Sequence, residues 1–183
     1  MICLLTGQVG VGKTTVAERV AGRAQRNGLV CGGLLSPALK NPCGQKLGIW
    51  GVDLASGERR LLARVDRELG GPVVGVYSFD AQAIDWAVGT IERATRESDL
   101  VFVDEIGKLE LWRDEGLAPV LPLLTSQMAA RALVIVRREL LEELQARLSG
   151  VETSVFEVTE ANRDHAPARV LTILGQGEQE VVS

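Results

Sequence analysis

The sequence lacks the features that mark several classes of protein. Its three cysteines and single histidine are too few for a disulfide framework, and Cys31, Cys43 and the distant His165 do not complete a structural zinc site. No apolar run approaches the ~20 residues that a membrane-spanning helix needs. The formal net charge is −4, so no overall positive field favours nucleic acid. We therefore expect no membrane span, and nucleic acid is a disfavoured partner.

The N-terminus also lacks the basic segment of a secretory signal peptide, because its apolar residues lead directly into a glycine-rich loop. We expect a cytoplasmic location. A length of 183 residues, with 46% hydrophobic and 24% charged residues, suits one α/β domain over residues 1–183. The polar residues 175–183 predict a frayed tail. We expect a monomer, and the sequence identifies no protein partner.

A glycine-rich loop follows the first apolar run. Ile2–Thr6 is typical of a buried strand, and the residues from Gly7 to Thr14 fit the pattern G-x-x-x-x-G-K-[ST] of a phosphate-binding P-loop. Glycines let the backbone wrap so that successive N–H groups point at phosphate oxygens, and the following helix presents its positive end to the same anion. We predict that Lys13 reaches the β- and γ-phosphates and that the Thr14 hydroxyl binds Mg²⁺. The predicted phosphate-binding residues are Gly7, Gln8, Val9, Gly10, Val11, Gly12, Lys13, Thr14 and Thr15.

Apolar runs and apolar helix faces divide the rest of the chain into alternating strands and helices. This alternation indicates an α/β fold with a mainly parallel central sheet. Residues 36–44 are rich in turn formers and predict a loop, whereas residues 29–65 as a whole predict an inserted antiparallel β-hairpin. The insertion either covers the nucleotide as a flap or extends the sheet. Predicted strands cover 1–6, 29–35, 45–54, 59–65, 73–77, 100–103, 132–136 and 154–158, and predicted helices cover 13–26, about 80–98 (capped by Ser78 or Asp80), 116–128 (with a late start at its prolines), 138–148 and 160–174.

A second motif follows the apolar run 100–103. Asp104 and Glu105 come where this predicted strand ends, as in a Walker B segment, and the carboxyl ends of strands are where open α/β sheets place ligands. We predict that Asp104 holds Mg²⁺ beside Thr14. Glu105 is then the candidate general base that orients and deprotonates the attacking water.

The segment from Asp104 to Leu111, Asp-Glu-Ile-Gly-Lys-Leu-Glu-Leu, resembles the signature of the small nucleoside-triphosphatases first described from hyperthermophiles, whose vertebrate member is a cancer-related nucleoside-triphosphatase. Three further segments, at 7–15, 52–57 and 158–164, are similar to the P-loop, the inserted hairpin and the C-terminal Thr-x-x-Asn-Arg segment of this family. The resemblance spans most of the chain in order. Residues 36–43 depart from the family pattern, and Trp112 stands where a smaller aromatic is common.

The resemblance implies a RecA-like P-loop fold of three layers and Mg²⁺-dependent hydrolysis of nucleoside triphosphates such as ATP and GTP. Lys108, three residues after Glu105, is either a positive charge over the γ-phosphate or a surface lysine in a salt bridge. Arg163 is either a contact to base or phosphate or a solvated charge. Arg137 and Arg138 also follow a predicted strand at its carboxyl end, where a solvated helix start is the alternative.

Two other functions remain open. A small-molecule or nucleotide kinase uses the same P-loop core with a hydroxyl acceptor in place of water, and it needs an arginine-rich lid and a dedicated acceptor pocket. A nucleotide-gated binding module hydrolyses slowly and only times the release of a partner. The sequence shows no clear lid and no partner surface, so hydrolysis is the favoured interpretation.

Overall fold

The computed structural model describes residues 1–126 and 131–176. The end of the helix predicted over 116–128 and most of the predicted frayed tail lie outside these described residues. The strands are β1 (Ile2–Gly7), β2 (Cys31–Leu35), β3 (Ala38–Lys40), β4 (Lys46–Asp53), β5 (Arg59–Arg64), β6 (Val73–Val74), β7 (Tyr77–Phe79), β8 (Leu100–Ile106), β9 (Ala132–Val136) and β10 (Thr153–Val158). The helices are α1 (Lys13–Arg26), α2 (Ala81–Glu97), α3 (Lys108–Arg113), α4 (Val120–Thr125), η1 (Arg138–Leu140), α5 (Leu141–Arg147) and α6 (Ala166–Ile173).

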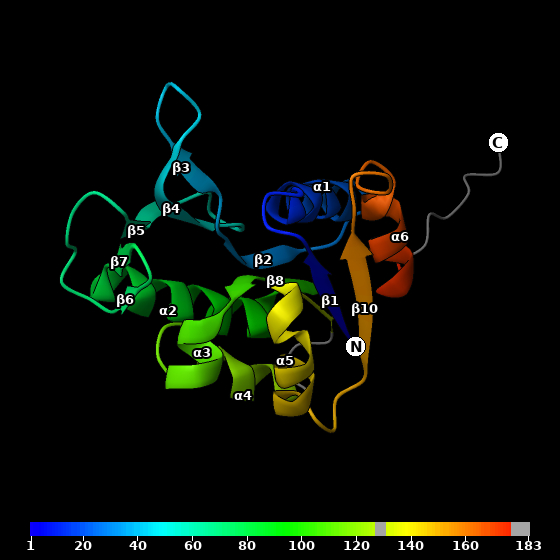
Figure 1. Cartoon of the computed structure of the whole chain (residues 1–183). Helices are drawn as coiled ribbons and strands as arrows, with labels where there is room; N and C mark the ends of the chain where they lie inside the picture. Colours follow the sequence, from blue (N-terminus) through cyan, green and yellow to red (C-terminus); the bar gives the residue numbers. More distant parts are fainter. Residues whose placement is uncertain (127–130, 177–183) are drawn as a thin grey trace.

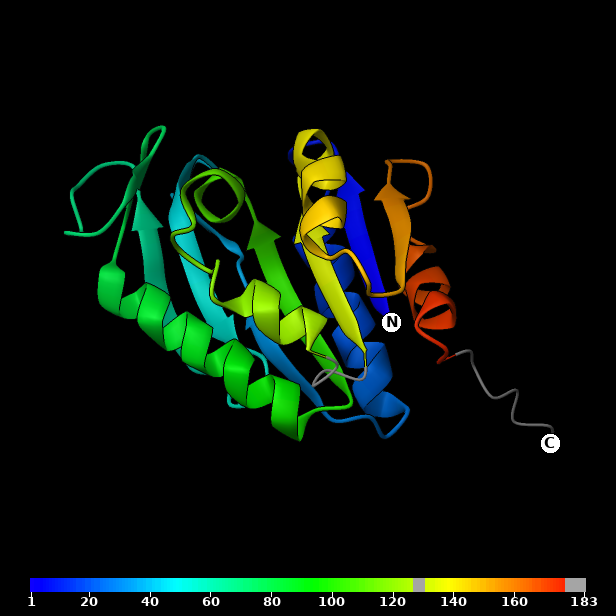
Figure 2. The same ribbon diagram turned by 90° about the horizontal axis from the view of Figure 1, so that it is seen from below.

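The described strands form one sheet in the order β10-β1-β9-β8-β2-β4-β5-β7-β6, with β3 paired to β4. Helices α1 and α6 cover one face, and α2, α3, α4 and α5 cover the other, so the molecule has three layers (Figures 1 and 2). Each face has its own hydrophobic cluster. Leu4 packs with α2, α4 and α5, whereas its neighbour Leu5 packs with α1 and α6. A strand that is covered on both faces must be apolar throughout, and for this reason β1 reads as an unbroken apolar run.

The sheet has a parallel part and an antiparallel part. β10, β1, β9, β8 and β2 pair in parallel, whereas β4, β5, β7 and β6 add antiparallel strands beyond β2. The predicted mainly parallel sheet with an inserted antiparallel hairpin is confirmed. The insertion differs in extent from the predicted 29–65, because β2 belongs to the parallel part and the antiparallel strands continue to Phe79.

Two local predictions in the insertion are wrong. The segment predicted as a loop at 36–44 contains the short strand β3, which pairs with β4. The segment predicted as one strand at 73–77 folds back on itself, so that β6 and β7 pair with each other. Gly75 sits between them with a φ of 59°, a backbone conformation that glycine adopts without steric cost. The antiparallel strands extend the sheet, which is one of the two roles predicted for the insertion.

Several helices also differ from prediction. The sequence pattern missed α3, although Gly107 before it and Glu110 in its first turn are a helix-start signal. The last helix begins at Ala166 instead of 160, because the side chain of Asn162 bonds the Thr159 amide and the Glu157 carbonyl and holds a turn there. Helix α4 starts late, as its prolines indicated, and the helix predicted at 138–148 opens with the 3₁₀ turn η1.

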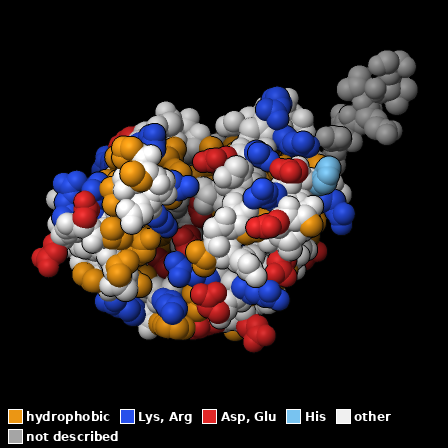
Figure 3. Space-filling model, turned by 45° about the horizontal axis from the view of Figure 1, so that its top comes forward, with side chains coloured by type: hydrophobic (Ala, Val, Ile, Leu, Met, Phe, Trp, Pro, Cys, Tyr) orange, Lys and Arg blue, Asp and Glu red, His pale blue; other side chains and the backbone are white. Residues whose placement is uncertain are grey.

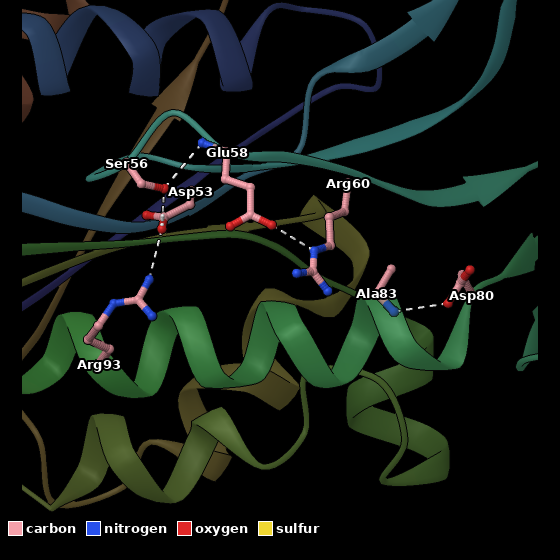
Figure 4. Close-up of polar contacts among 7 residues, drawn as sticks. All are labelled: Asp53, Ser56, Glu58, Arg60, Asp80, Ala83 and Arg93. Atoms are coloured by element: carbon pink, nitrogen blue, oxygen red, sulfur yellow. Dashed lines mark hydrogen bonds and ion pairs between the residues drawn. The ribbon is translucent and has the colours of Figure 1, made fainter.

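Helix α2 is attached to the insertion at both ends (Figure 4). Asp80 caps its first turn by accepting a hydrogen bond of 2.9 Å from the Ala83 amide, which selects Asp80 over Ser78 as the cap. Near the other end, Arg93 donates to the buried carboxylate of Asp53 at 2.8 Å. Asp53 also accepts from Ser56 in the turn after β4. The Asp80 amide also donates to the Leu62 carbonyl of β5 at 2.9 Å, so both ends of α2 are bonded to the antiparallel strands.

Among residues 1–126 and 131–176, no helix is both long enough and apolar enough to span a lipid bilayer.

Candidate active site

The carboxyl ends of the parallel strands bring the predicted site residues together. β1 ends at the P-loop, β8 carries Asp104 and Glu105 near its end, and Arg137 follows β9 directly. β9 lies between β1 and β8. Ser36 follows β2 on the other side of β8. Parallel strands end at the same edge of a sheet, so four segments that are remote in sequence converge on one site.

The P-loop has the backbone that phosphate binding requires. Gly7 has a φ of 138°, and a Cβ there would lie 2.4 Å from the Val158 carbonyl oxygen, so only glycine fits beside β10. Helix α1 starts after Gly12, which has no side chain to cap the first amides. The N–H groups of the first turn and the positive end of the helix are thereby left for an anion.

Lys13 lies folded over the loop. Its ammonium donates hydrogen bonds of 2.8 Å to the Gly7 carbonyl and 2.9 Å to the Gln8 carbonyl. Burial lowers the pKa of Lys13 below its ordinary value, while the charges of Glu105 and Asp104 act in the opposite direction. The structure thus places Lys13 within electrostatic reach of both carboxylates, as the sequence predicted.

Asp104 is the most deeply buried acid of the site, with 2% of its surface exposed. The Ser36 amide donates to its carboxylate at 3.0 Å, and the Ser36 hydroxyl bonds the Asp104 carbonyl oxygen. Burial and then the charge of Glu105 raise the pKa of Asp104 to about 7, against the effect of hydrogen bonds from Ser36 and from the Thr14 hydroxyl. The Thr14 side chain thus lies close to the Asp104 carboxylate, so the P-loop and the acidic strand meet where the sequence predicts a metal site.

Glu105 is held by a partner that the sequence identified only as one of two alternatives. Arg137 donates from Nε to the Glu105 carboxylate at 2.7 Å. Arg137 therefore belongs to the site, and its position directly after β9 was the signal for it. Ser36 was missed altogether, because it lies in a segment that departs from the family pattern and nothing in its type or spacing indicates a site.

The remaining predicted residues lie at the margin. The Lys108 ammonium lies 4.8 Å from the centre of the Trp112 ring, in an exposed position at the start of α3. Arg163 is exposed in the turn after β10, whose last residue, Val158, is paired with Gly7. Both residues stand near the edge that carries the site. Thr15 and Val9 are exposed on the P-loop side.

A cavity of about 450 Å³ adjoins the acidic pair on the side of the antiparallel strands. The polar and charged side chains of its lining belong to Ser36, Tyr77, Asp104, Glu105, Lys108, Glu110 and Arg137. The other walls are mainly apolar and come from β4, β5, the β6–β7 hairpin, α2, α3 and the loop at 116–117. In Figure 3 this part of the surface shows hydrophobic side chains beside a hollow with acidic and basic side chains deeper within it.

The oxygen ligands of the site fit a hydrated divalent cation. Thr14 and Asp104 offer a hydroxyl and a carboxylate that lie close to each other. No group of three or more His, Cys, Asp and Glu residues that could hold a metal exists among the described residues. A small hard cation needs no such group, because it keeps several waters and takes its other ligands from phosphate oxygens.

A loop with the P-loop pattern, a threonine after it and two acids at the same sheet edge are the features of a P-loop nucleotide-binding protein. A family described as NTPase matches residues 2–171. The nucleoside-triphosphatase THEP1 of Methanothermobacter thermautotrophicus is 35% identical over 96% of this chain and 97% of its own length. The chain belongs to this NTPase family.

Two solved structures have the same fold. The crystal structure of THEP1 from the hyperthermophile Aquifex aeolicus matches with a TM-score of 0.72 and 25% identity, over 95% of this chain and 99% of that one. The solution structure of a human cancer-related nucleoside triphosphatase matches with a TM-score of 0.70 and 26% identity, over 97% and 98%. The resemblance read from residues 104–111 and the predicted P-loop fold are confirmed.

Proposed function

We propose that the protein hydrolyses nucleoside triphosphates, ATP and GTP among them, to nucleoside diphosphate and phosphate in a Mg²⁺-dependent reaction. The observation that carries the proposal is that Lys13 and Thr14 of the P-loop motif lie close to the acids of β8. The P-loop follows β1, and β9 separates β1 from β8. The proximity of Thr14 to Asp104 brings a phosphate cradle and a buried carboxylate to one point, which is what a metal-bound polyphosphate requires.

The residues of the chain divide the work of binding. Loop amides and the first turn of α1 bind the phosphate oxygens. Lys13 exchanges its two carbonyl acceptors for the β- and γ-phosphates, because phosphate oxygens are stronger acceptors for an ammonium than neutral carbonyls are. Thr14 and Asp104 hold Mg²⁺, which supplies charge neutralisation to the transferring phosphoryl group.

Glu105 orients and deprotonates the attacking water in this proposal. Its carboxylate is 29% exposed at the cavity, so a water can reach it. Arg137 holds one carboxylate oxygen of Glu105, which fixes the side chain and leaves the second oxygen for the water. Lys108 and Arg163 are supporting candidates, the first as a positive charge near the γ-phosphate and the second as a contact to the nucleotide.

The test is phosphate release from ATP, GTP, CTP and UTP, with and without Mg²⁺, for the wild-type protein and Glu105→Gln. We expect release to require Mg²⁺ and Glu105→Gln to lose about 10²–10⁴-fold in turnover, with nucleotide affinity retained. Glu92→Gln, which removes an exposed acid on α2, is the matched control and should turn over normally. Unchanged turnover in Glu105→Gln would remove this residue from the mechanism.

The cytoplasmic location, the monomeric state and a single domain over residues 1–183 stay predictions from the sequence.

A further inference from the structure

We propose that the cavity beside Glu105 is the binding site of a second substrate, a small apolar alcohol whose hydroxyl accepts the γ-phosphoryl group in place of water. The proposal rests on the proposed function, since it uses the same triphosphate site and the same base. It adds a substrate class that hydrolysis alone does not need.

The first argument is the size and chemistry of the cavity. A volume of about 450 Å³ lies within the range of about 300–1,000 Å³ that small-molecule sites occupy. A water nucleophile needs room for about one probe sphere, a small fraction of this volume. The walls are apolar side chains such as Leu62, Phe79 and Ile84. An apolar space next to a charged centre is favourable only for a ligand with an apolar body.

The second argument is the position of the cavity relative to the two halves of the site. β1 and its P-loop lie on one side of β8, with β9 between them, whereas β5 and β7 lie on the other side. Glu105 lines the cavity and also acts electrostatically on Lys13. The base therefore stands between the phosphate cradle and the apolar space, where an acceptor hydroxyl has to be.

The third argument is that the walls are held in place. Buried Glu110 accepts from the amides of Gly107 at 2.8 Å and Leu117 at 3.1 Å, and so joins the start of α3 to the loop at 116–117. Gly116 packs so closely on this carboxylate that a Cβ would lie 2.5 Å from it. Across the cavity, Arg113 of α3 donates to the Val73 carbonyl of the hairpin at 2.9 Å. Hydrogen bonds therefore connect the walls of the cavity to one another, so the cavity is a preformed site.

The charges of the site favour a neutral alcohol over an anion. The two basic residues that line the cavity are both engaged, Arg137 with the Glu105 carboxylate and Lys108 over the Trp112 ring. Asp104 and Glu105 face the same polar end and repel a second anion. A hydroxyl, in contrast, can donate to the free oxygen of Glu105.

The proposed step balances as a transfer of the phosphoryl group. The alcohol oxygen forms a bond to the γ-phosphorus while the bond from that phosphorus to the bridging oxygen breaks. The electron pair of the broken bond stays on the departing nucleoside diphosphate. Glu105 accepts the hydroxyl proton and releases it to solvent, and the products are a phosphomonoester and a nucleoside diphosphate.

The experiment uses the full-length protein with Mg·ATP and three apolar alcohols, namely 2-phenylethanol, 2-naphthaleneethanol and geraniol, with glycerol as a polar control. Phosphorus NMR separates a phosphomonoester from inorganic phosphate, and ligand-observed NMR measures binding. We expect at least one apolar alcohol to bind and to form its phosphomonoester, while glycerol does neither. 2-Methylnaphthalene, which has no hydroxyl, should compete for binding and suppress ester formation.

Ala87→Leu provides a variant test, because Ala87 is fully buried on α2 and lines the cavity. The larger side chain should lower the ratio of phosphomonoester to inorganic phosphate about tenfold or more. Ala81→Leu, the same change at an exposed position of α2, should leave the ratio unaltered. The competition by 2-methylnaphthalene tests the same point without any substitution, should Ala87→Leu fail to fold.

The two proposals fail in different ways. If inorganic phosphate is released but no apolar alcohol binds or is phosphorylated, the acceptor site is refuted and hydrolysis stands. If the protein neither releases phosphate nor phosphorylates any acceptor, the proposed function itself is refuted. Binding of an alcohol that 2-methylnaphthalene and Ala87→Leu leave unchanged would place that alcohol elsewhere and overturn the inference.

Discussion

Replacing Asp104 by asparagine is expected to stabilise the nucleotide-free protein. The side chain is 2% exposed, and burial, followed by the charge of Glu105, raises its pKa from 3.8 to about 7. The folded protein therefore binds this proton more tightly than the unfolded chain does. This tighter proton binding stabilises the fold fully at pH values below 3.8, the pKa of the unfolded chain, and the stabilisation is lost as the pH rises toward 7. At 1.36 kcal/mol for each pKa unit, the ionised carboxylate costs the folded state about 4 kcal/mol at pH 8.

Asparagine has nearly the same shape and keeps an oxygen for the Ser36 amide, which donates to Asp104 at 3.0 Å, but it carries no charge. We expect Asp104→Asn to be more stable than the wild-type protein by about 4 kcal/mol at pH 8. At pH 5, where the wild-type carboxyl is largely protonated in the fold, we expect a difference of only about 1–2 kcal/mol. Urea unfolding without Mg²⁺ or nucleotide at the two pH values measures both numbers.

The control is Asp85→Asn, which removes an exposed acid on α2 and should not reproduce the change with pH. Asp104→Asn should also lose phosphate release, because the carboxylate that holds Mg²⁺ in our proposal is gone. If Asp104→Asn is only as stable as the wild-type protein at both pH values, the buried charge of Asp104 does not destabilise the fold.

Three further substitutions test the site and its support. Lys13→Ala should weaken triphosphate binding about 10–100-fold, as expected for the loss of one charge-assisted hydrogen bond. Titration with a nonhydrolysable triphosphate measures this affinity, and a normal value would contradict the assignment of the P-loop. Gly7→Ala should destabilise the fold by about 1–3 kcal/mol, because its Cβ would lie 2.4 Å from the Val158 carbonyl oxygen, and thermal unfolding at the wild-type melting temperature would disprove this. Asp53→Ala should lower the free energy of unfolding by about 2–3 kcal/mol, since it leaves the partners of a buried carboxylate unpaired. Arg93→Ala changes a side chain that is 49% exposed and should lower it by less than about 1 kcal/mol. Equal losses for the two variants in urea unfolding would refute this reasoning.

The parallel half of the fold and the main site residues could be predicted because local patterns determine them. The P-loop spacing places Lys13 and Thr14 at the start of α1 whatever the rest of the chain does. The apolar run before Asp104 places that carboxyl group at the end of a buried strand. Because parallel strands end at the same edge of a sheet, these residues lie at one edge once the strands pair.

The parts that could not be predicted depend on tertiary partners. Ser36 gains its role only because β2 pairs with β8, and a serine before a proline gives no sign of this. For Arg137 the sequence offers two alternatives, a charge on the ligand side and a solvated helix start, and its ion pair with Glu105 depends on a contact with another strand. The hairpin at 73–79 is too short for a periodic pattern, and its pairing with β5 is decided by contacts from outside the segment.

In our two proposals Glu105 serves both the triphosphate and a second substrate, and the order of strands allows this. Neighbouring strands lie about 4.8 Å apart, so the strand between β1 and β8 separates the P-loop from the acidic pair by about 10 Å at the backbone. Side chains as long as Lys13 and Glu105 can reach across this distance, which leaves room for a phosphate group and a metal ion. On the other side of β8, β2 and β4 separate the acids from β5, and the space there is lined by Ser36, Ile49 and Leu62. If β8 were adjacent to β1, the carboxylates would fill the place of the phosphate, so β9 between them is what makes a two-sided site possible.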